Sequence, residues 1–293
     1  MHKSGFVNII GSPNVGKSTL MNILVGERLS IITSKAQTTR HRILGIVNDE
    51  EHQIVFSDTP GIVDPAYKMH EGMMGFVKSA ITDADVILLM VEVKERQFKD
   101  QEILEKLQKT EVPIILLINK IDEIDQTFLE EKVNYWKEIL PKAKVYPISA
   151  LHDFNVDQVL LEIKALLPEC PPFYDKDQLT DKPEKFFVSE IIREKILLNY
   201  KKEIPYSCEV EIEAFKEEPK IIRIRAVIMV IRDSQKGILI GHQGKELKKV
   251  GTLARKDIEK FFDKKVFLEL YVKVNKDWRN SEDQLKRFGY LNK

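Results

Sequence analysis

The apolar residues in the first half of the chain follow two alternating patterns. Short, mostly continuous runs rich in β-branched residues are typical of parallel strands that are buried on both faces. Such runs occupy residues 5–11, 52–58, 85–93, 112–120 and 144–150. Segments with apolar residues at helical spacing separate them, at 18–26, 71–84, 99–110, 125–140 and 155–167. This alternation predicts a three-layer α/β domain with a mainly parallel sheet.

One further strand is expected within residues 38–49, "TTRHRILGIVND". Only a short turn, "NDEEH", joins it to the strand at 52–58, so these two strands should pair antiparallel. The first domain is therefore expected to carry one antiparallel strand on an otherwise parallel sheet.

The pattern changes after residue 167. The segment 168–185 is rich in proline and aspartate and has no periodicity, which is typical of a linker. Beyond it the chain predicts helix, strand, strand, helix, helix and strand, at 186–200, 207–215, 220–233, 234–240, 245–262 and 266–274. This order indicates a smaller α+β domain. We expect a first domain at 1–170, a linker at 171–185 and a second domain with a C-terminal tail at 186–293.

Composition adds constraints on the class of protein. Apolar residues make up 43% and charged residues 31% of the 293 residues, a balance typical of soluble globular proteins. The longest apolar runs have strand length, so no membrane span is expected. No signal peptide is expected either, because the first predicted strand begins at residue 5. Cys170 and Cys208 are the only cysteines, which predicts a reducing compartment and no disulfide framework. The six histidines have no metal-ligand spacing.

The zero net charge hides an asymmetry between the two halves. Residues 201–293 contain 22 Lys and Arg against 15 Asp and Glu, a balance of +7. The whole chain has 46 of each, so residues 1–200 carry 24 against 31, a balance of −7. A basic half can meet a polyanion, although a solvated surface of mixed charge would give the same count.

A glycine loop follows the first strand and opens the first helix. Its sequence "GSPNVGKST" fits the phosphate-binding pattern G-x-x-x-x-G-K-[ST]. Glycines let the backbone N–H groups converge on an anion at the positive end of the helix. Lys17 supplies an ammonium to the β- and γ-phosphates, and the Ser18 hydroxyl can ligate Mg²⁺. The expected nucleotide contacts are Gly11, Ser12, Pro13, Asn14, Val15, Gly16, Lys17, Ser18 and Thr19.

Two further segments at strand ends complete the phosphate and base sites. "DTPG" supplies Asp58, which can hold Mg²⁺ through water, and Gly61, whose N–H can reach a γ-phosphate. "NKID" supplies Asp122, whose carboxylate can accept the guanine N1–H and N2–H₂ donors that adenine lacks. In "PISA", a backbone N–H can meet guanine O6. The further expected GTP contacts are Asp58, Thr59, Pro60, Gly61, Asn119, Lys120, Asp122, Ser149 and Ala150.

Together these segments, in this order and each at the carboxyl end of a strand, resemble the translation-factor-like GTPases. The resemblance covers the whole first domain and implies a GTP/GDP site with Mg²⁺. By position, "SKAQTTRHR" at 34–42 is similar to switch I of that class, which supplies a threonine to the metal. Thr38 and Thr39 both qualify, and Thr39 is preferred. The expected metal ligands are Ser18, Thr39 and Asp58.

The sequence says less about how the γ-phosphate is cleaved. Ras-type switches place a glutamine after the glycine of "DTPG" to orient water, whereas this chain has Ile62. We therefore expect slow intrinsic hydrolysis that depends on K⁺, RNA or another supplied group. In related GTPases an asparagine at the position of Asn14 ligates K⁺; the alternative is that Asn14 only shapes the loop. The expected catalytic residues are Lys17, Asn14 and Thr39.

A second glycine loop, "GHQG", lies between two helices of the second domain. It lacks the Lys-Ser/Thr ending, so it is not a second nucleotide site. G-x-x-G between two helices in an α-β-β-α-α-β order resembles the type II KH fold, which binds the backbone of single-stranded RNA; a plain helix–helix turn is the alternative reading of the four residues. The expected RNA contacts are Gly241, His242, Gln243, Gly244, Lys245, Lys248 and Lys249.

The combination of both domains narrows the family. "KAQTTRHRI" and "SEIIREK", with the boxes above and "IGHQGKELKKVG", resemble the Era-type GTPases over essentially the full chain. That resemblance implies a monomeric cytoplasmic GTPase that binds the 3′ end of 16S rRNA and assists 30S subunit assembly and rRNA maturation. It also implies a peripheral fraction at the inner membrane, which only surface basicity would support here.

Two rival functions remain open on the sequence. The second domain could bind protein or membrane instead of RNA, or the chain could be a passive RNA-binding protein with a vestigial nucleotide site. The intact Lys17, Ser18, Asp58 and Asp122 argue against the second rival. In the charged tail, Trp278, Phe288 and Tyr290 could stack on bases, but packing on their own domain is the preferred interpretation.

Overall fold

The computed structural model describes residues 2–95, 97–98 and 100–291. The chain folds into two compact units. The first contains the described residues up to Ser30, together with Thr39–Ala66 and His70–Asp181. The second contains Ile31–Thr38, Tyr67–Met69 and the described residues from Lys182 onward. Two short segments of the first half of the sequence therefore belong to the second unit, which the hydrophobic pattern does not predict.

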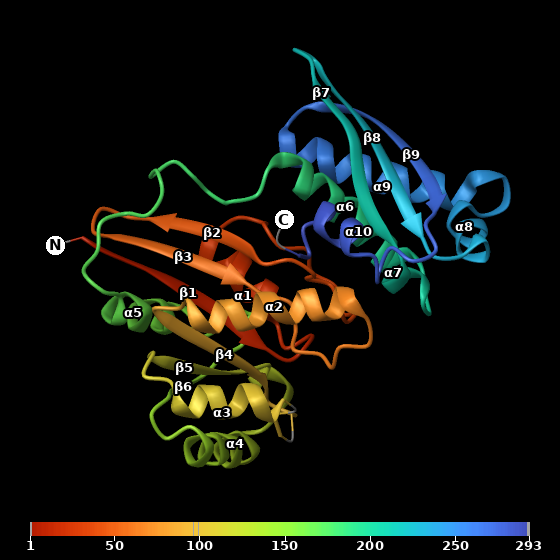
Figure 1. The fold of residues 1–293 in the computed structure, drawn as a ribbon. Coiled ribbons are helices and arrows are strands. Elements are labelled where there is room, and N and C mark those ends of the chain that lie inside the picture. Colours follow the sequence, from red (N-terminus) through yellow and green to blue (C-terminus); the bar gives the residue numbers. More distant parts are fainter. Residues whose placement is uncertain (1, 96, 99, 292–293) are drawn as a thin grey trace. The chain divides into compact units, whose positions relative to one another are not determined.

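A six-stranded sheet forms the centre of the first unit, in the order β2-β3-β1-β4-β5-β6 (Figure 1). The strands β2 and β3 pair antiparallel, and the other neighbours pair parallel, as the sequence predicts. The strand bounds are Lys3–Gly11 (β1), Ile43–Asn48 (β2), His52–Asp58 (β3), Val86–Glu92 (β4), Ile114–Asn119 (β5) and Lys144–Pro147 (β6). The strand expected within 38–49 begins only at Ile43.

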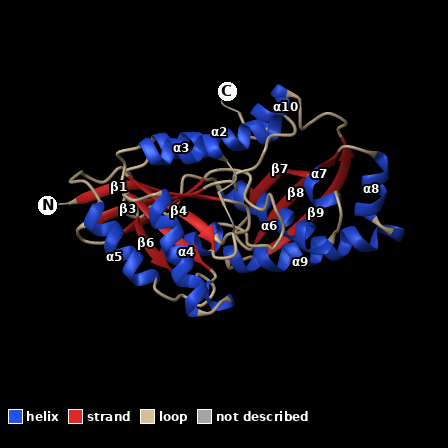
Figure 2. Cartoon of the chain, turned by 90° about the horizontal axis from the view of Figure 1, so that it is seen from below, coloured by secondary structure: helices blue, strands red, loops and turns tan. Residues whose placement is uncertain are grey.

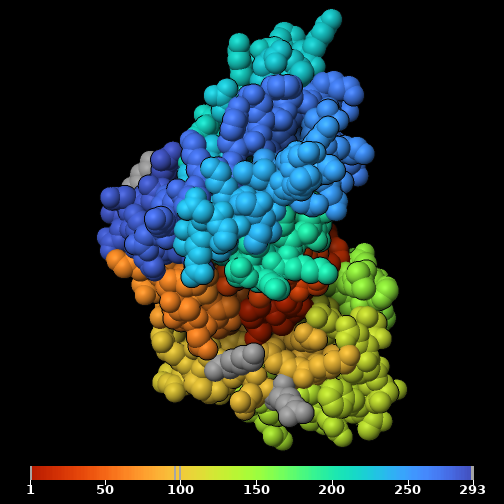
Figure 3. Space-filling view, turned by 90° about the vertical axis from the view of Figure 1, so that its right-hand side faces the viewer, coloured from red at the N-terminus to blue at the C-terminus, as the bar shows by residue number. Residues whose placement is uncertain are grey.

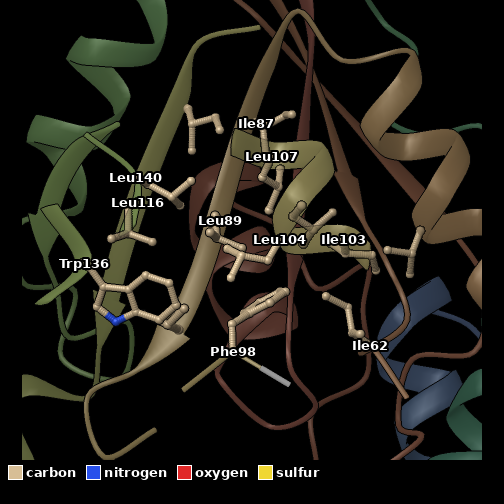
Figure 4. Close-up of a cluster of buried hydrophobic side chains, with 14 of the residues drawn as sticks. Ile62, Ile87, Leu89, Phe98, Ile103, Leu104, Leu107, Leu116, Trp136 and Leu140 are labelled. Carbon is tan, nitrogen blue, oxygen red and sulfur yellow. The ribbon is translucent and has the colours of Figure 1, made fainter. Parts of the chain in front are cut away.

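Helices cover both faces of this sheet. Figure 1 shows α1 and α2 on opposite sides of it. The helices are Lys17–Val25 (α1), Lys68–Thr82 (α2), Gln101–Lys109 (α3), Gln126–Ile139 (α4) and Val156–Leu166 (α5), with a 3-10 turn at Ile121–Glu123. One buried cluster joins apolar side chains of β4 and β5 to those of α2, α3 and α4, and Trp136 is its largest member (Figure 4). Burial of these side chains fixes the carboxyl ends of the strands, where the expected nucleotide contacts lie.

Residues expected to form the linker instead lie along β2. The Ile46 N–H donates to the Leu179 carbonyl at 2.8 Å, and the Leu44 N–H donates to the Asp181 carboxylate at 3.0 Å. The Thr180 hydroxyl in turn donates to the Leu44 carbonyl at 2.6 Å. The proline- and aspartate-rich segment is therefore bound to the sheet up to Asp181, because the edge strand offers it unpaired backbone groups.

The second unit has a three-stranded sheet in the order β7-β8-β9. The strands Glu209–Glu217 (β7) and Ile221–Val230 (β8) pair antiparallel, and β8 pairs parallel with Lys265–Val274 (β9). Helices α6 and α9 pack on this sheet around one apolar core (Figure 2). The helices are Glu184–Asn199 (α6), Ile204–Ser207 (α7), Asp233–Ile240 (α8), Lys245–Phe262 (α9) and Glu282–Arg287 (α10). The expected α-β-β-α-α-β order is present, while α7 and α10 were not predicted.

The C-terminal tail packs on its own unit, as expected. Trp278 is fully buried, and its indole N–H donates to the Ser207 carbonyl at 3.3 Å. The hydroxyl of the buried Tyr290 donates to the Glu209 carboxylate at 2.6 Å. These rings are consequently not free to stack on bases. Among the described residues, the helices are too short or too polar to span a lipid bilayer.

Candidate functional site

The first glycine loop joins β1 to α1. Gly16 precedes the helix with φ of 107°, a conformation that L side chains rarely adopt. A Cβ at this position would lie 2.3 Å from Nδ2 of Asn119. Glycine therefore serves two purposes here, because it permits the turn and leaves room for the asparagine of the base-binding segment.

Lys17 is buried at the start of α1 and reaches back into the loop. Its ammonium donates to the carbonyls of Gly11 and Ser12 at 3.0 and 2.8 Å, which holds it inside the loop. Burial lowers the pKa of Lys17 to about 8, although the nearby carboxylates of Asp58 and Glu95 favour the charged form. A cation kept at this position can meet the β- and γ-phosphates of a nucleotide.

The lowered pKa of Lys17 predicts a pH-dependent nucleotide affinity. Phosphate contact requires the charged amine, which the free protein loses as pH rises through about 8. We expect the affinity for GTP to fall about tenfold between pH 7 and pH 9, because binding must then take up a proton. Titration with a fluorescent GTP analogue measures this slope. Lys17→Met should bind the GTP analogue weakly, and its affinity should not fall with pH in this way. Ionisation of the nucleotide itself affects the wild type and the variant equally.

The three expected metal ligands converge. The Ser18 hydroxyl donates to Oδ2 of Asp58 at 2.7 Å, the Thr39 hydroxyl donates to the same oxygen at 3.2 Å, and the two hydroxyl oxygens are 2.8 Å apart. Asp58 is fully buried, and its Oδ1 has no hydrogen-bond partner among the described residues. Burial raises the pKa of the Asp58 carboxyl, so a cation here would compensate an unfavourable charge. An oxygen-only donor set with one unpartnered carboxylate oxygen fits Mg²⁺.

The structure separates the two threonines of the switch I segment. The Thr38 hydroxyl donates to the Lys35 carbonyl at 2.6 Å and also lies 2.6 Å from the Thr33 hydroxyl. The Thr39 hydroxyl lies with Ser18 and Asp58. Of the two candidates, this geometry favours Thr39 as the residue that reaches a metal ion.

The "DTPG" segment turns directly beneath the glycine loop. A Cβ on Gly61 would lie 2.7 Å from the Pro13 Cα, and the Ile62 N–H donates to the Gly11 carbonyl at 3.2 Å. The Thr59 hydroxyl donates to the Ile9 carbonyl at 2.7 Å and anchors the turn. Ile62 itself is buried in the apolar cluster near Phe98 (Figure 4). Its apolar side chain has no group that could orient a water molecule for attack on a phosphate.

The base-binding residues form a connected set. Nδ2 of the buried Asn119 donates to the Val15 carbonyl at 2.7 Å, and its Oδ1 accepts the Ala150 N–H at 2.9 Å. The Asp122 carboxylate accepts the Ser149 hydroxyl at 2.5 Å, and this hydrogen bond lowers its pKa, so Asp122 remains ionised at neutral pH. The Ala150 N–H, one of the backbone donors that "PISA" offers for guanine O6, is thus engaged by Asn119.

Lys120 and Glu95 complete the surroundings of the site. Lys120 adopts a left-handed conformation with φ of 66° and pairs with Glu92 at 3.0 Å. Glu95 follows β4 and accepts the Ser12 hydroxyl at 2.6 Å. Glu95 belongs to none of the sequence motifs. Its position just beyond the carboxyl end of a parallel strand is the one signal that could have indicated it.

The second glycine loop lies between α8 and α9, in the light-blue part of the chain that reaches the surface in Figure 3. Gly241, Gln243 and Gly244 have φ of 70°, 50° and 75°. A Cβ at Gly244 would meet nothing within 4 Å, so the backbone there is open to a ligand. The exposed residues at the loop and the first turns of α9 include one carboxylate among the lysines, and they are His242, Gln243, Lys245, Glu246, Lys248 and Lys249.

Exposed lysines at the start of an 18-residue helix, beside an open backbone, have the charge and the access that binding of an anion requires. The structure thus brings together the expected RNA-contact residues in one loop and one helix start. The rest of the unit contributes the apolar core that holds α8 and α9 against the sheet.

Two family models match this chain, one in its N-terminal half and one in its C-terminal part. A family model described as a 50S ribosome-binding GTPase matches residues 6–120, and a KH domain model matches residues 203–279. Proteins named GTPase Era from Staphylococcus haemolyticus and Staphylococcus epidermidis are 46% and 45% identical to this chain over 292 residues, which is 99% of this chain and 98% of each relative.

Two solved structures are similar over both units. One is a crystal structure of Era with MgGDPNP and nucleotides 1506–1542 of 16S ribosomal RNA, with a TM-score of 0.95, 38% identity and 99% coverage of each chain. The other is an Era variant from Aquifex aeolicus bound to GDP and AlF4−, with a TM-score of 0.94 and 38% identity over 98% of this chain and 99% of that one.

Proposed function

Because this chain belongs to the Era family of GTPases, we propose that it is a GTP-driven switch that binds the 3′ end of 16S rRNA through its second unit. In this role it assists assembly of the 30S subunit and maturation of its RNA. The observation that carries the proposal is the presence, in one chain, of a converged nucleotide and metal site and of an open glycine loop flanked by exposed lysines.

Each residue of the nucleotide site has a defined task in this proposal. Lys17 and the loop N–H groups bind the phosphates, and Asp122 selects guanine by accepting its two donors. Ser18, Thr39 and Asp58 would hold Mg²⁺, which neutralises charge on the phosphate oxygens when it is bound. Thr39 would also sense the γ-phosphate, so its environment differs between the GTP and GDP states.

Hydrolysis requires a group that Ile62 cannot supply, and we propose that K⁺ held by Asn14 contributes to it. We expect hydrolysis to be about tenfold faster in KCl than in NaCl at equal ionic strength, equivalent to about 1.4 kcal/mol. Asn14 has φ of 63°, so Asn14→Gly removes its side chain without backbone strain. If Asn14→Gly retains the preference for K⁺, the asparagine only shapes the loop.

RNA binding through the second glycine loop is tested by Gly244→Asp. The site has space for a side chain, so the substitution adds a negative charge beside the RNA phosphates, together with the backbone strain of a non-glycine residue at φ of 75°. We expect the affinity for a 16S 3′-end oligonucleotide to fall about thirtyfold, or about 2 kcal/mol, and wild-type binding to weaken steeply with salt. Fluorescence anisotropy in the presence of a GTP analogue measures both.

Gly26→Asp is the matched control for this experiment. Gly26 has φ of 79°, close to the 75° of Gly244, and it too has open space around a Cβ. The control therefore carries the same charge and a similar backbone penalty, but it lies in the first unit. Equal RNA affinity in Gly244→Asp and Gly26→Asp, with weak salt dependence, would instead favour a second unit that binds protein or membrane.

The proposal also requires that RNA binding depends on the bound nucleotide. If the first unit were vestigial, wild-type protein would bind RNA equally well with GTP, with GDP and without nucleotide. Lys17→Ala would then leave RNA binding unchanged.

We further propose that the protein acts as a cytoplasmic monomer, with any peripheral membrane fraction dependent on its basic second unit. Cell fractionation followed by immunoblotting tests whether the protein is cytoplasmic or membrane-associated.

A further inference from the structure

A buried arginine in the second unit holds the backbone of the switch I segment. The Arg193 guanidinium, on α6, is only 1% exposed. It donates to both carboxylate oxygens of Glu190, at 2.7 and 2.5 Å. Its remaining donors reach the carbonyls of Gln37, at 3.2 Å, and of Thr38. One side chain thus joins an acidic partner on its own helix to two consecutive carbonyls of the segment 31–38.

A second contact fastens the same segment to the same helix. The Lys35 ammonium donates to the carbonyls of Leu197 and Tyr200, at the C-terminal end of α6. Cations at this end of a helix are favourable, because the last carbonyls have no partner within the helix. Gln37 turns between the two contacts with φ of 56°. Residues 35–38 are therefore held at both ends along α6.

The next residue in the chain belongs to the nucleotide site. Thr38 lies in the second unit, whereas Thr39 lies in the first and hydrogen bonds Ser18 and Asp58. A single peptide bond separates the carbonyl that Arg193 holds from the residue that carries the expected metal ligand. Because a peptide unit is planar and rigid, the placement of the Thr38 carbonyl restricts where the Thr39 hydroxyl can lie.

The energetic cost of this arrangement makes a purely structural role a poor explanation. Two opposite charges withdrawn from water gain little net stability from their attraction, and an apolar pair of similar size is often as stable. The guanidinium is suited to the task because its planar fork can satisfy a carboxylate and two carbonyls at once. Lysine could not make this set of contacts.

We propose that Arg193, oriented by Glu190, is a positioning residue that couples the nucleotide state to the second unit by holding the Gln37–Thr38 backbone. This inference rests on the proposed function, because it assumes that Thr39 senses Mg²⁺ and the γ-phosphate. In this proposal, Glu190 and Arg193 of "SEIIREK" transmit a change in the nucleotide site to the second unit. When Thr39 leaves the metal site, the pull on residues 37 and 38 reaches α6 through these contacts.

The test is the double variant Glu190→Gln/Arg193→Met in the full chain. Changing both residues avoids leaving a buried carboxylate without its cation, which would destabilise the fold. The measured quantity is the ratio of RNA affinity with a GTP analogue to RNA affinity with GDP. We expect this ratio to fall to within about twofold of one, while GDP affinity and the melting temperature stay close to wild type.

Glu194→Gln/Lys195→Met provides the matched control. These neighbours on α6 form a buried ion pair at 2.7 Å, but Lys195 extends to Asp257 of α9 rather than to the switch segment. We expect this variant to retain the wild-type ratio. If the control variant lowers this affinity ratio as much as the double variant does, at an unchanged melting temperature, Arg193 has no specific role in the coupling.

A third variant covers the case in which the double variant does not fold. Arg193→Lys retains the charge beside Glu190 but cannot donate to both carbonyls, and we expect it to lower the ratio at least threefold. A folded double variant, or a folded Arg193→Lys, with the wild-type ratio would overturn the inference. If wild-type protein shows no dependence on nucleotide, the proposed function fails instead, so the two failures can be distinguished.

Discussion

Replacing Asp122 with asparagine is expected to lower the affinity for GTP about a thousandfold. The carboxylate can accept both the N1–H and N2–H₂ donors of guanine, whereas an amide presents its own N–H₂ group to one of them. Loss of two charge-assisted hydrogen bonds costs about 4 kcal/mol. The Ser149 hydroxyl, 2.5 Å from Asp122, can still donate to the amide oxygen, so the loop should keep its shape. Isothermal titration with GTP and GDP measures the change.

The same variant should gain affinity for xanthosine triphosphate, which carries an oxygen where guanine carries its amino group. A reversal of preference separates loss of base recognition from general damage to the site. Glu123→Gln is the control, because this neighbouring acidic residue is exposed and pairs with Lys94 at 2.6 Å. We expect it to bind GTP like the wild type. Weak binding of both nucleotides by Asp122→Asn would show that the loop had been disrupted.

The second large effect is expected from Thr39→Ala. Its hydroxyl lies 2.8 Å from that of Ser18 and donates to Asp58, and both partners are expected metal ligands. Removing a group that stabilises the charge of the transferring phosphate typically costs about 10²–10³ in rate. We expect single-turnover GTP hydrolysis to slow about 300-fold, with GDP affinity within about threefold of wild type, because in the proposed function Thr39 senses the γ-phosphate, which GDP lacks.

Thr38→Val tests whether that effect belongs to one hydroxyl or to the segment as a whole. Valine matches threonine in shape and keeps the backbone carbonyl, but it loses the hydrogen bonds to Lys35 and Thr33. We expect hydrolysis within about threefold of wild type. If Thr38→Val slows hydrolysis as much as Thr39→Ala, the order of the segment matters more than the identity of the ligand.

Much of the fold could be predicted because strand and helix periods are local properties of the sequence. The runs at 85–93 and 112–120 became β4 and β5, and the helical spacing at 245–262 became α9 with the same bounds. The glycine loop between β1 and α1 was also predictable, since a phosphate loop requires glycine, lysine and a hydroxyl at fixed spacing. Long periodic segments and short fixed motifs are the features that sequence reasoning reads best.

The remaining features depend on contacts between residues distant in sequence. Thr39 hydrogen bonds Ser18 and Asp58 rather than joining a ladder, and β2 begins only at Ile43. A charged Arg193 within a helix is normally read as a solvated residue, and no local pattern indicates that two carbonyls from the first half of the chain bury it. Glu95 is similar, because its partner Ser12 is 83 positions away.

The segment along β2 has a consequence for solubility. An outermost strand with open N–H and carbonyl groups is a template on which another molecule can add a strand, and such pairing leads to aggregation. Here Thr180 and its neighbours satisfy Leu44 and Ile46 from within the same molecule. The stretch that looks like a tether in the sequence thus also shields this part of the sheet from intermolecular β-pairing.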